Sequence, residues 1–185
     1  MADINSQLAS RQRAPALPKA GAGLPAQALD PHLLTFVELL FFAYRDFTGE
    51  ADAILAEFGL GRAHHRVLHF VNRHPGLRVA DLLQILKITK QSLARVLKEL
   101  VDRGWIVQRA GERDRRQRLL FSTEKGSRLA RRLDSVQSKR VAQALLRAGS
   151  GTEDAVARFL FAMIAEEERP PVRALLPSCG IGDRV

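Results

Sequence analysis

The segment from Val79 to Gly104 constrains the fold most, because it encodes two helices with almost no chain between them. Val79 to Leu86 is a compact apolar run, and the three residues that follow are enough only for a turn whose last residue, Thr89, can cap a helix. From Lys90 to Arg103, apolar residues recur at i, i+3, i+4 and i+7, namely Leu93, Val96, Leu97 and Leu100. This spacing predicts a helix-turn-helix unit whose second helix has one apolar face and one basic face.

Two strands are predicted directly after this unit. Gly104 ends the second helix, the run from Trp105 to Arg109 has residues typical of a strand, and Leu119 to Phe121 is its expected hairpin partner. The charged stretch between them contains Gly111, which favours a protruding loop. The order helix, turn, helix, strand, loop, strand is that of a winged helix-turn-helix. The predicted fold class is therefore mainly α, or α+β with a small β-hairpin wing.

Further helices are predicted on both sides of this unit. One opens at Asp30-Pro31 and reaches about Asp46, and shorter helical stretches run from Glu50 to Phe58 and from Arg62 to Arg73. Thr123 caps a long helix to about Arg147, and a last helix starts at Thr152 and stops at Pro170-Pro171. The expected organisation is a disordered arm (1–27), N-terminal dimerization helices (28–60), the winged helix-turn-helix (61–122), C-terminal dimerization helices (123–169) and a flexible tail (170–185).

The first and last predicted helices carry more apolar residues than one buried face can use. In the first helix these residues lie on nearly every side, whereas a surface helix shows a single apolar stripe. A second copy of the chain is the simplest cover for them, so we predict an obligate-type homodimer. The candidate dimerization residues are Leu33, Phe36, Leu40, Phe41, Val156, Phe159, Leu160 and Met163.

The net charge of +9 lies entirely between Lys87 and Arg132, where 14 lysines and arginines face 5 acidic residues. Such a field favours a polyanionic partner, and it falls on the two elements that a winged helix presents to double-stranded DNA. A plain solvated face remains the alternative interpretation. The candidate DNA contacts are Lys90, Gln91, Ser92, Arg95 and Lys98 for the major groove and Arg113, Arg115 and Arg116 for the minor groove. Asp114 would repel phosphate, so we interpret it as a clamp on a neighbouring arginine or backbone amide.

Other classes of function find little support in the residues. The sequence has no nucleophile elbow, phosphate-binding loop or zinc-protease motif, which argues against an enzyme, and we expect no cofactor. His65 and His69 have the i, i+4 spacing of a metal pair, but nothing in the sequence evidently completes such a site, and histidines that hydrogen-bond at a junction or face DNA are favoured. The single cysteine, Cys179, and the absence of a long apolar run favour a cytoplasmic protein that does not enter membranes.

The run DRRQRLLFSTEKG, from Asp114 to Gly126, resembles the D-x-R and L-T-x-x-G signature of the MarR family. The stretch LLQILKITKQSLARVLKELVDRGWIVQR resembles that family's helix-turn-helix and first wing strand, and FFAYRDF with GRAHHRVLHF resembles its PetP-like branch. The resemblance covers roughly residues 31 to 147. One departure is Ser122, where the family has Leu.

The resemblance implies a bacterial transcription regulator in which Asp114 and Arg116 take the place of the D-x-R pair. It also implies a homodimer whose two recognition helices read a pseudo-palindromic operator, and it allows a small-molecule effector. A second interpretation is an architectural or nucleoid-associated protein that uses the same fold without operator selectivity. Only the regulator should keep a large ratio of specific to non-specific affinity.

Overall fold

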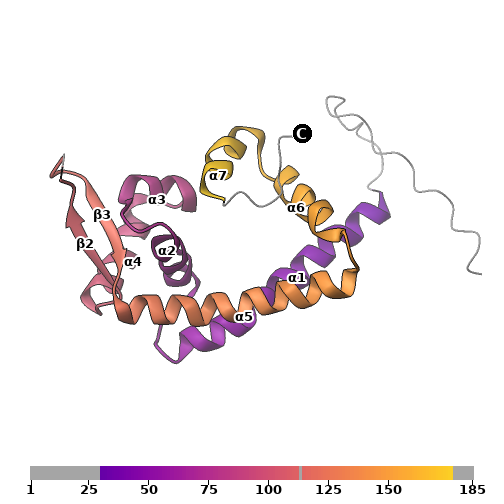
Figure 1. Ribbon diagram of the computed structural model, residues 1–185, viewed down its shortest axis with the longest axis horizontal. Helices are drawn as coiled ribbons and strands as arrows, with labels where there is room; N and C mark the ends of the chain where they lie inside the picture. The colour runs from indigo at the N-terminus through magenta and orange to yellow at the C-terminus, as the bar shows by residue number, and fades with distance from the viewer. Residues whose placement is uncertain (1–29, 113, 177–185) are drawn as a thin grey trace, which may run out of the picture. The chain divides into compact units, whose positions relative to one another are not determined.

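The computed structural model describes residues 30–112 and 114–176 and is mostly helical with one small sheet (Figure 1). The expected arm at 1–27, Arg113 and residues 177–185 lie outside the described residues. The chain divides into two compact units after Leu40. The elements are α1 (Pro31–Ala56), α2 (Arg62–Arg73), β1 (Leu77–Arg78), α3 (Val79–Leu86), α4 (Lys90–Asp102), β2 (Ile106–Ala110), β3 (Arg118–Ser122), α5 (Glu124–Ala148), α6 (Thr152–Ala162), the 3₁₀ turn η2 (Glu166–Glu168) and α7 (Arg169–Leu175). The predicted fold class is confirmed.

The sheet has three antiparallel strands in the order β1-β3-β2. β2 and β3 form the predicted hairpin, with Val107 opposite Phe121 and Gln108 opposite Leu120. Sequence analysis missed β1, which is only two residues long and pairs Leu77 with Leu120. Pairing of β1 with β3 therefore joins the residues that precede α3 to the base of the wing.

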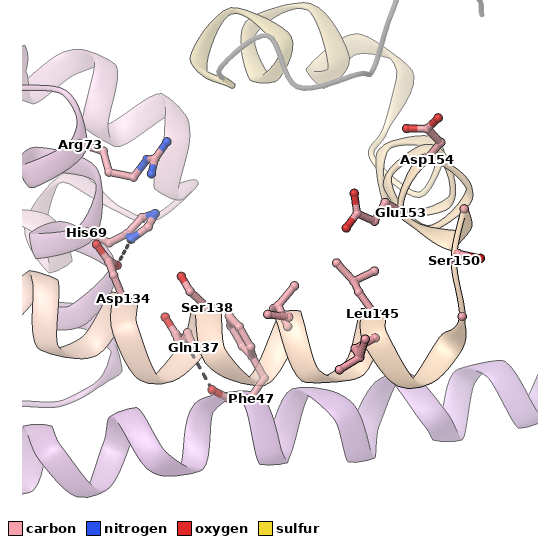
Figure 2. A pocket seen from close by; sticks show the side chains of 15 residues that line it. Phe47, His69, Arg73, Asp134, Gln137, Ser138, Leu145, Ser150, Glu153 and Asp154 are labelled. Carbon is pink, nitrogen blue, oxygen red and sulfur yellow. Dashed lines mark hydrogen bonds and ion pairs between the residues drawn. The ribbon is translucent and has the colours of Figure 1, made fainter.

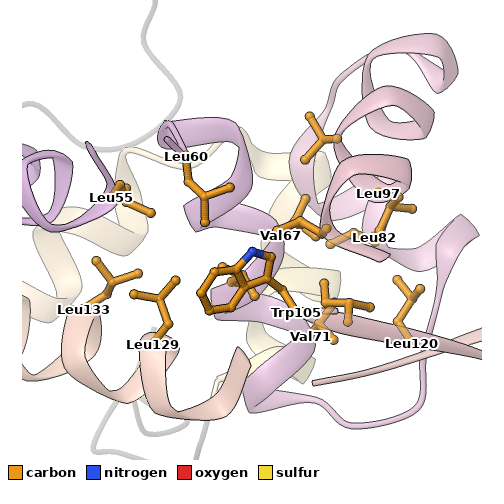
Figure 3. Close-up of a cluster of buried hydrophobic side chains, with 14 of the residues drawn as sticks. Leu55, Leu60, Val67, Val71, Leu82, Leu97, Trp105, Leu120, Leu129 and Leu133 are labelled. Carbon is orange, nitrogen blue, oxygen red and sulfur yellow. The ribbon is translucent and has the colours of Figure 1, made fainter. Parts of the chain in front are cut away.

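The hydrophobic core lies among the end of α1, helices α2, α3, α4 and α5, and the base of the wing (Figure 3). Each helix contributes its apolar face, and the side chain of Trp105 at the start of the wing is 3% exposed. Fully burying one aliphatic side chain contributes about 1.5–3 kcal/mol. The largest fully buried side chains are Leu55, Leu68, Leu82, Leu93, Leu100, Ile106, Leu120, Leu133, Val67 and Val71.

The N-terminal helix differs from its prediction. It begins at Pro31 as expected, with the His32 amide donating to the Asp30 carboxylate at 2.9 Å. The predicted break between Asp46 and Glu50 is wrong, because α1 continues through Gly49 to Ala56. The Thr48 hydroxyl donates to the Tyr44 carbonyl at 2.9 Å, and Ala51 and Leu55 are fully buried. Packing of this last part of α1 in the core outweighs the low helix propensity of glycine.

The helices at the C-terminal end also differ from their prediction. A single helix from Thr152 to Pro170-Pro171 was predicted, but α6 ends at Ala162 and a separate helix, α7, spans Arg169–Leu175. The two prolines therefore begin a helix instead of ending one, which they can do because the first helical positions need no backbone donor. The part of the predicted flexible tail up to Leu175 is thus helical.

The junction between wing and α5 is held by an unusually close backbone contact. Thr123 caps α5: its hydroxyl accepts from the Gly126 amide at 3.0 Å and donates to the Gly104 carbonyl at 2.8 Å. A Cβ atom on Gly126 would lie 2.0 Å from the Trp105 carbonyl oxygen, which is backbone and cannot move aside easily. The junction therefore requires glycine at position 126 for reasons of space.

We expect Gly126→Ala to lower the free energy of unfolding by about 3 kcal/mol or more, because the methyl group overlaps backbone. Gly49→Ala is the matched control: Gly49 is helical with nothing within 4 Å of its added Cβ, so this variant should gain about 0.5–1 kcal/mol. Chemical denaturation monitored through Trp105 measures both values. Equal stability of the two variants would contradict the assigned contact.

Candidate nucleic-acid interface

Helix α4 presents one face to the core and the other to solvent. The Thr89 hydroxyl caps its first turn by accepting from the Ser92 amide at 3.1 Å. The four apolar residues that sequence analysis placed on its inner face are all buried. Consequently the candidate contact residues are all exposed, namely Lys90, Gln91, Ser92, Arg95 and Lys98.

Most cations of the candidate interface have no carboxylate partner. Elsewhere some arginines of α1, α2 and α5 are paired, for example Arg132 with Glu57 at 2.8 Å and Arg62 with Asp52 at 2.7 Å, and others are not. On α4, Lys98 pairs with Asp102 one turn later. Within the described residues no ion pair involves Lys90, Arg95, Arg115, Arg116 or Arg118. The positive field of the candidate interface is therefore not neutralised locally.

Hydrogen bonds hold the wing loop in a turn on which its described arginines are exposed. The Asp114 carboxylate accepts from the Arg116 backbone amide at 2.9 Å, one of the two arrangements predicted for this residue. The Gly111 amide donates to the Gln117 carbonyl at 3.1 Å, and a Cβ at Gly111 would lie 2.8 Å from the Asp114 carbonyl oxygen. Arg115 and Arg116 are exposed at the turn that results, and Arg113 is outside the described residues.

A polar network that sequence analysis missed holds α4 against α2. The His64 ring accepts from the Gly61 amide at Nδ1 (3.1 Å) and binds Glu99 of α4 through Nε2 (3.0 Å). Glu99 also accepts from Arg103 at 3.0 Å, and the hydrogen bond from His64, followed by that from Arg103, lowers the pKa of its carboxyl. Arg103 in turn donates to the Phe58 carbonyl. Only the exposed face of α4 remains available for a ligand.

His65 and His69 have the spacing of a metal pair, but His69 is hydrogen-bonded to a carboxylate instead. His69 Nδ1 lies 2.8 Å from Asp134 Oδ1 on α5, so a carboxylate that sequence analysis did not foresee is present 65 residues away. His65 is half-buried, and burial, with a smaller effect of His69, lowers its pKa. In the described part of the chain, no group of three or more residues is placed to hold a metal ion.

A cavity of about 950 Å³ lies among α2, α5 and α6 (Figure 2). Figure 2 shows Arg73 and His69 at one end and Glu153 and Asp154 at the other, with the apolar floor formed by α5 and Phe47. The Asp134 carboxylate also lies at the Arg73 end, 2.8 Å from His69.

The exposed large apolar side chains of the described residues lie in α1, the later part of α5 and α6, and just after α6 and α7. Sixteen large hydrophobic residues of the described chain are exposed, and none belongs to α2, α3, α4 or the wing. In α1 they include Leu33, Phe36 and Phe41, the last being 71% exposed, whereas Leu40 is half-buried. In and just after α6 they are Val156, Phe159, Leu160 and Met163. Apolar surface of this extent marks an interaction site.

Comparison with known proteins identifies the family. The family model described as MarR family matches residues 58–117. The HTH-type transcriptional regulator PetP of Rhodobacter capsulatus is 49% identical over 120 residues, which cover 65% of this chain and 72% of that protein. The chain belongs to the MarR family. This MarR-family protein is a transcriptional regulator. In its described residues, no helix is long and apolar enough to cross a membrane.

Solved structures agree on the fold. A MarR protein from Peptoclostridium difficile superimposes with a TM-score of 0.62 at 18% identity, covering 83% of this chain and 99% of that chain. A mutant MarR from E. coli in complex with operator DNA gives a TM-score of 0.54 at 18% identity, covering 82% and 100%. Both are similar to this regulator in the winged-helix arrangement of their elements.

The lowered pKa of His65 predicts a pH-dependent stability. Above its unfolded pKa of about 6.5 the residue is neutral in both states and contributes nothing, but below that value the unfolded chain binds a proton that the folded chain resists. The free energy of unfolding should therefore fall as the pH is lowered from about 7.5 to about 5.5. His65→Gln should flatten this slope, and His32→Gln, at an exposed position, should not. Denaturation at a series of pH values measures this; equal slopes in both variants would count against it.

Proposed function

We propose that this regulator binds double-stranded operator DNA, with α4 in the major groove and the wing in the minor groove, and that it is not an enzyme. The observation that carries the proposal is the set of exposed cations without carboxylate partners on α4 and the wing. Cations that are not already neutralised can exchange their counterions for phosphates, and this exchange supplies much of the affinity for DNA.

The two elements suit different parts of the duplex. The first turn of α4 carries Gln91 and Ser92, whose side chains can hydrogen-bond base edges, next to Lys90 and Arg95, which can reach guanine or phosphate. Arg115 and Arg116 on the wing are long side chains that suit a narrow and strongly negative minor groove. The similarity to a MarR protein solved with operator DNA supports this placement of the fold on a duplex.

We infer that two copies of the chain act together through the terminal helices. The exposed apolar residues of α1 and α6 support this, since a second copy would remove them from water. A dimer related by a two-fold axis presents two recognition helices, which then read a pseudo-palindrome with half-sites about one helical turn apart. The cavity among α2, α5 and α6 has the size of a small-molecule site, and we propose it as the place for an effector.

Arg95→Ala and Arg116→Ala should each weaken binding to the preferred duplex by about 1–3 kcal/mol. Each should also reduce the salt dependence of log K by about 0.9 if the lost contact is to phosphate. Lys139→Ala is the matched control, because it removes one exposed cation from the far half of α5 and should change little. Fluorescence anisotropy at several salt concentrations measures all three. Binding of both arginine variants at the parent level would contradict the proposed interface.

Selection from random duplex DNA distinguishes the regulator from the architectural alternative. A regulator should enrich a pseudo-palindrome, because each of its two recognition helices reads bases. A protein that binds through backbone contacts and DNA deformability alone should enrich no sequence. Recovery of no motif would therefore overturn operator selectivity while leaving DNA binding in place.

The dimer is tested by a charge placed on the exposed apolar side of α6. Leu160→Glu should shift the protein from dimer to monomer, because a carboxylate there would be buried without a partner. Arg158→Glu places a carboxylate on the opposite side of the same helix and should leave the dimer intact. Sedimentation velocity reports the mass of each variant. A monomeric parent, or a dimeric Leu160→Glu variant, would contradict the assigned interface.

A further inference from the structure

The turn between α3 and α4 holds one cation in a fixed position. Lys87 caps α3 in the left-handed conformation, with φ of 51°, and its amide donates to the Leu83 carbonyl at 3.0 Å. Arg66 of α2 donates to the neighbouring Leu86 carbonyl at 3.0 Å. Lys87 therefore stands on a braced turn, three residues before the first residue of α4.

The segment after α6 is braced as well. The Arg169 guanidinium donates to the carbonyls of Ala162 and Ile164, at 2.8 and 3.0 Å, which closes the chain back onto the end of α6. Arg173 of α7 lies over the ring of Phe161, 5.0 Å from its centroid, and that ring is 8% exposed. These contacts fix the position of the 3₁₀ turn that carries Glu166, Glu167 and Glu168.

The two braced segments meet in one ion pair. Lys87 Nζ lies 2.7 Å from Glu168 Oε1, a contact that joins residues 81 positions apart. We propose that Glu168 competes with DNA phosphate for Lys87, so that the segment from Glu166 to Leu175 acts as an autoinhibitory latch on the helix-turn-helix. This inference rests on the proposed DNA binding and adds to it a control that lies within the chain.

The exposure of the pair sets the size of the effect. The side chains of Lys87 and Glu168 are 61% and 34% exposed, so water and salt screen their attraction. Exposed pairs of this kind change an equilibrium by about two- to fivefold. Such a latch modulates the affinity for DNA without abolishing it. Lys87 can exchange the carboxylate for a phosphate when a duplex arrives, and Glu168 then has to move away from the duplex.

The test is a double-mutant cycle on DNA affinity, with one matched control. Glu168→Gln keeps the shape of the side chain and should tighten binding at low salt by about two- to fivefold relative to Glu167→Gln. Glu167 is the adjacent acid, is exposed, and is in no ion pair of the described residues, so its variant measures the general effect of losing one negative charge. The salt dependence of log K should steepen by about 0.9 in Glu168→Gln alone, because Lys87 then releases a counterion of its own.

The second side of the cycle uses Lys87→Gln. In that background Glu168→Gln should give no gain beyond that of Glu167→Gln, because the competed cation is gone. Equal affinities of Glu168→Gln and Glu167→Gln, or a gain that persists in Lys87→Gln, would overturn the latch. A parent protein that binds no duplex would instead overturn the proposed DNA binding. Thermal denaturation of each variant checks that the fold is kept.

Discussion

The close contact between the Trp105 carbonyl and Gly126 is the constraint on which the rest of the winged helix-turn-helix depends. It brings the end of α4, the first wing strand and the start of α5 to one point, and Thr123 closes that point by bonding to both Gly104 and Gly126. Trp105 fills the space beneath, with Lys125 stacked over its ring at 3.8 Å. The wing and α4 are thereby attached to the same scaffold.

The cations of this scaffold differ in whether a carboxylate neutralises them. Five cations of α1, α2 and α5 are paired with carboxylates, whereas Lys90 and Arg95 of α4 and Arg115, Arg116 and Arg118 of the wing are in no ion pair of the described residues. Net charge alone does not make this distinction, because it counts paired and unpaired groups equally. Lys87 combines both properties: it lies three residues before α4, and it is paired with Glu168. We propose that this difference in pairing determines which surface of the protein binds DNA.

Local signals in the sequence predicted the winged helix-turn-helix well. The i, i+3, i+4 spacing in α4, the caps at Thr89 and Thr123, and the order of the wing strands are all encoded within a few residues, and the structure shows these elements. Predictions failed where packing between distant segments decides the outcome. Gly49 suggested a break that core burial of Ala51 and Leu55 overrides, and Pro170-Pro171 suggested an end where a helix begins. The contacts His64–Glu99, His69–Asp134 and Lys87–Glu168 join residues 35 to 81 positions apart, and no local pattern marks them.

We propose that α4 and the wing contact one duplex together, in adjacent grooves. The most direct test attaches a DNA-cleaving iron chelate to single cysteines, Gln91→Cys or Arg116→Cys, in a Cys179→Ser background, and maps the cuts on a selected duplex. We expect cuts from position 91 staggered across a major groove and cuts from position 116 staggered across a minor groove roughly five base pairs away, about half a helical turn. Cleavage from only one of the two positions, or the same groove cut from both, would contradict it.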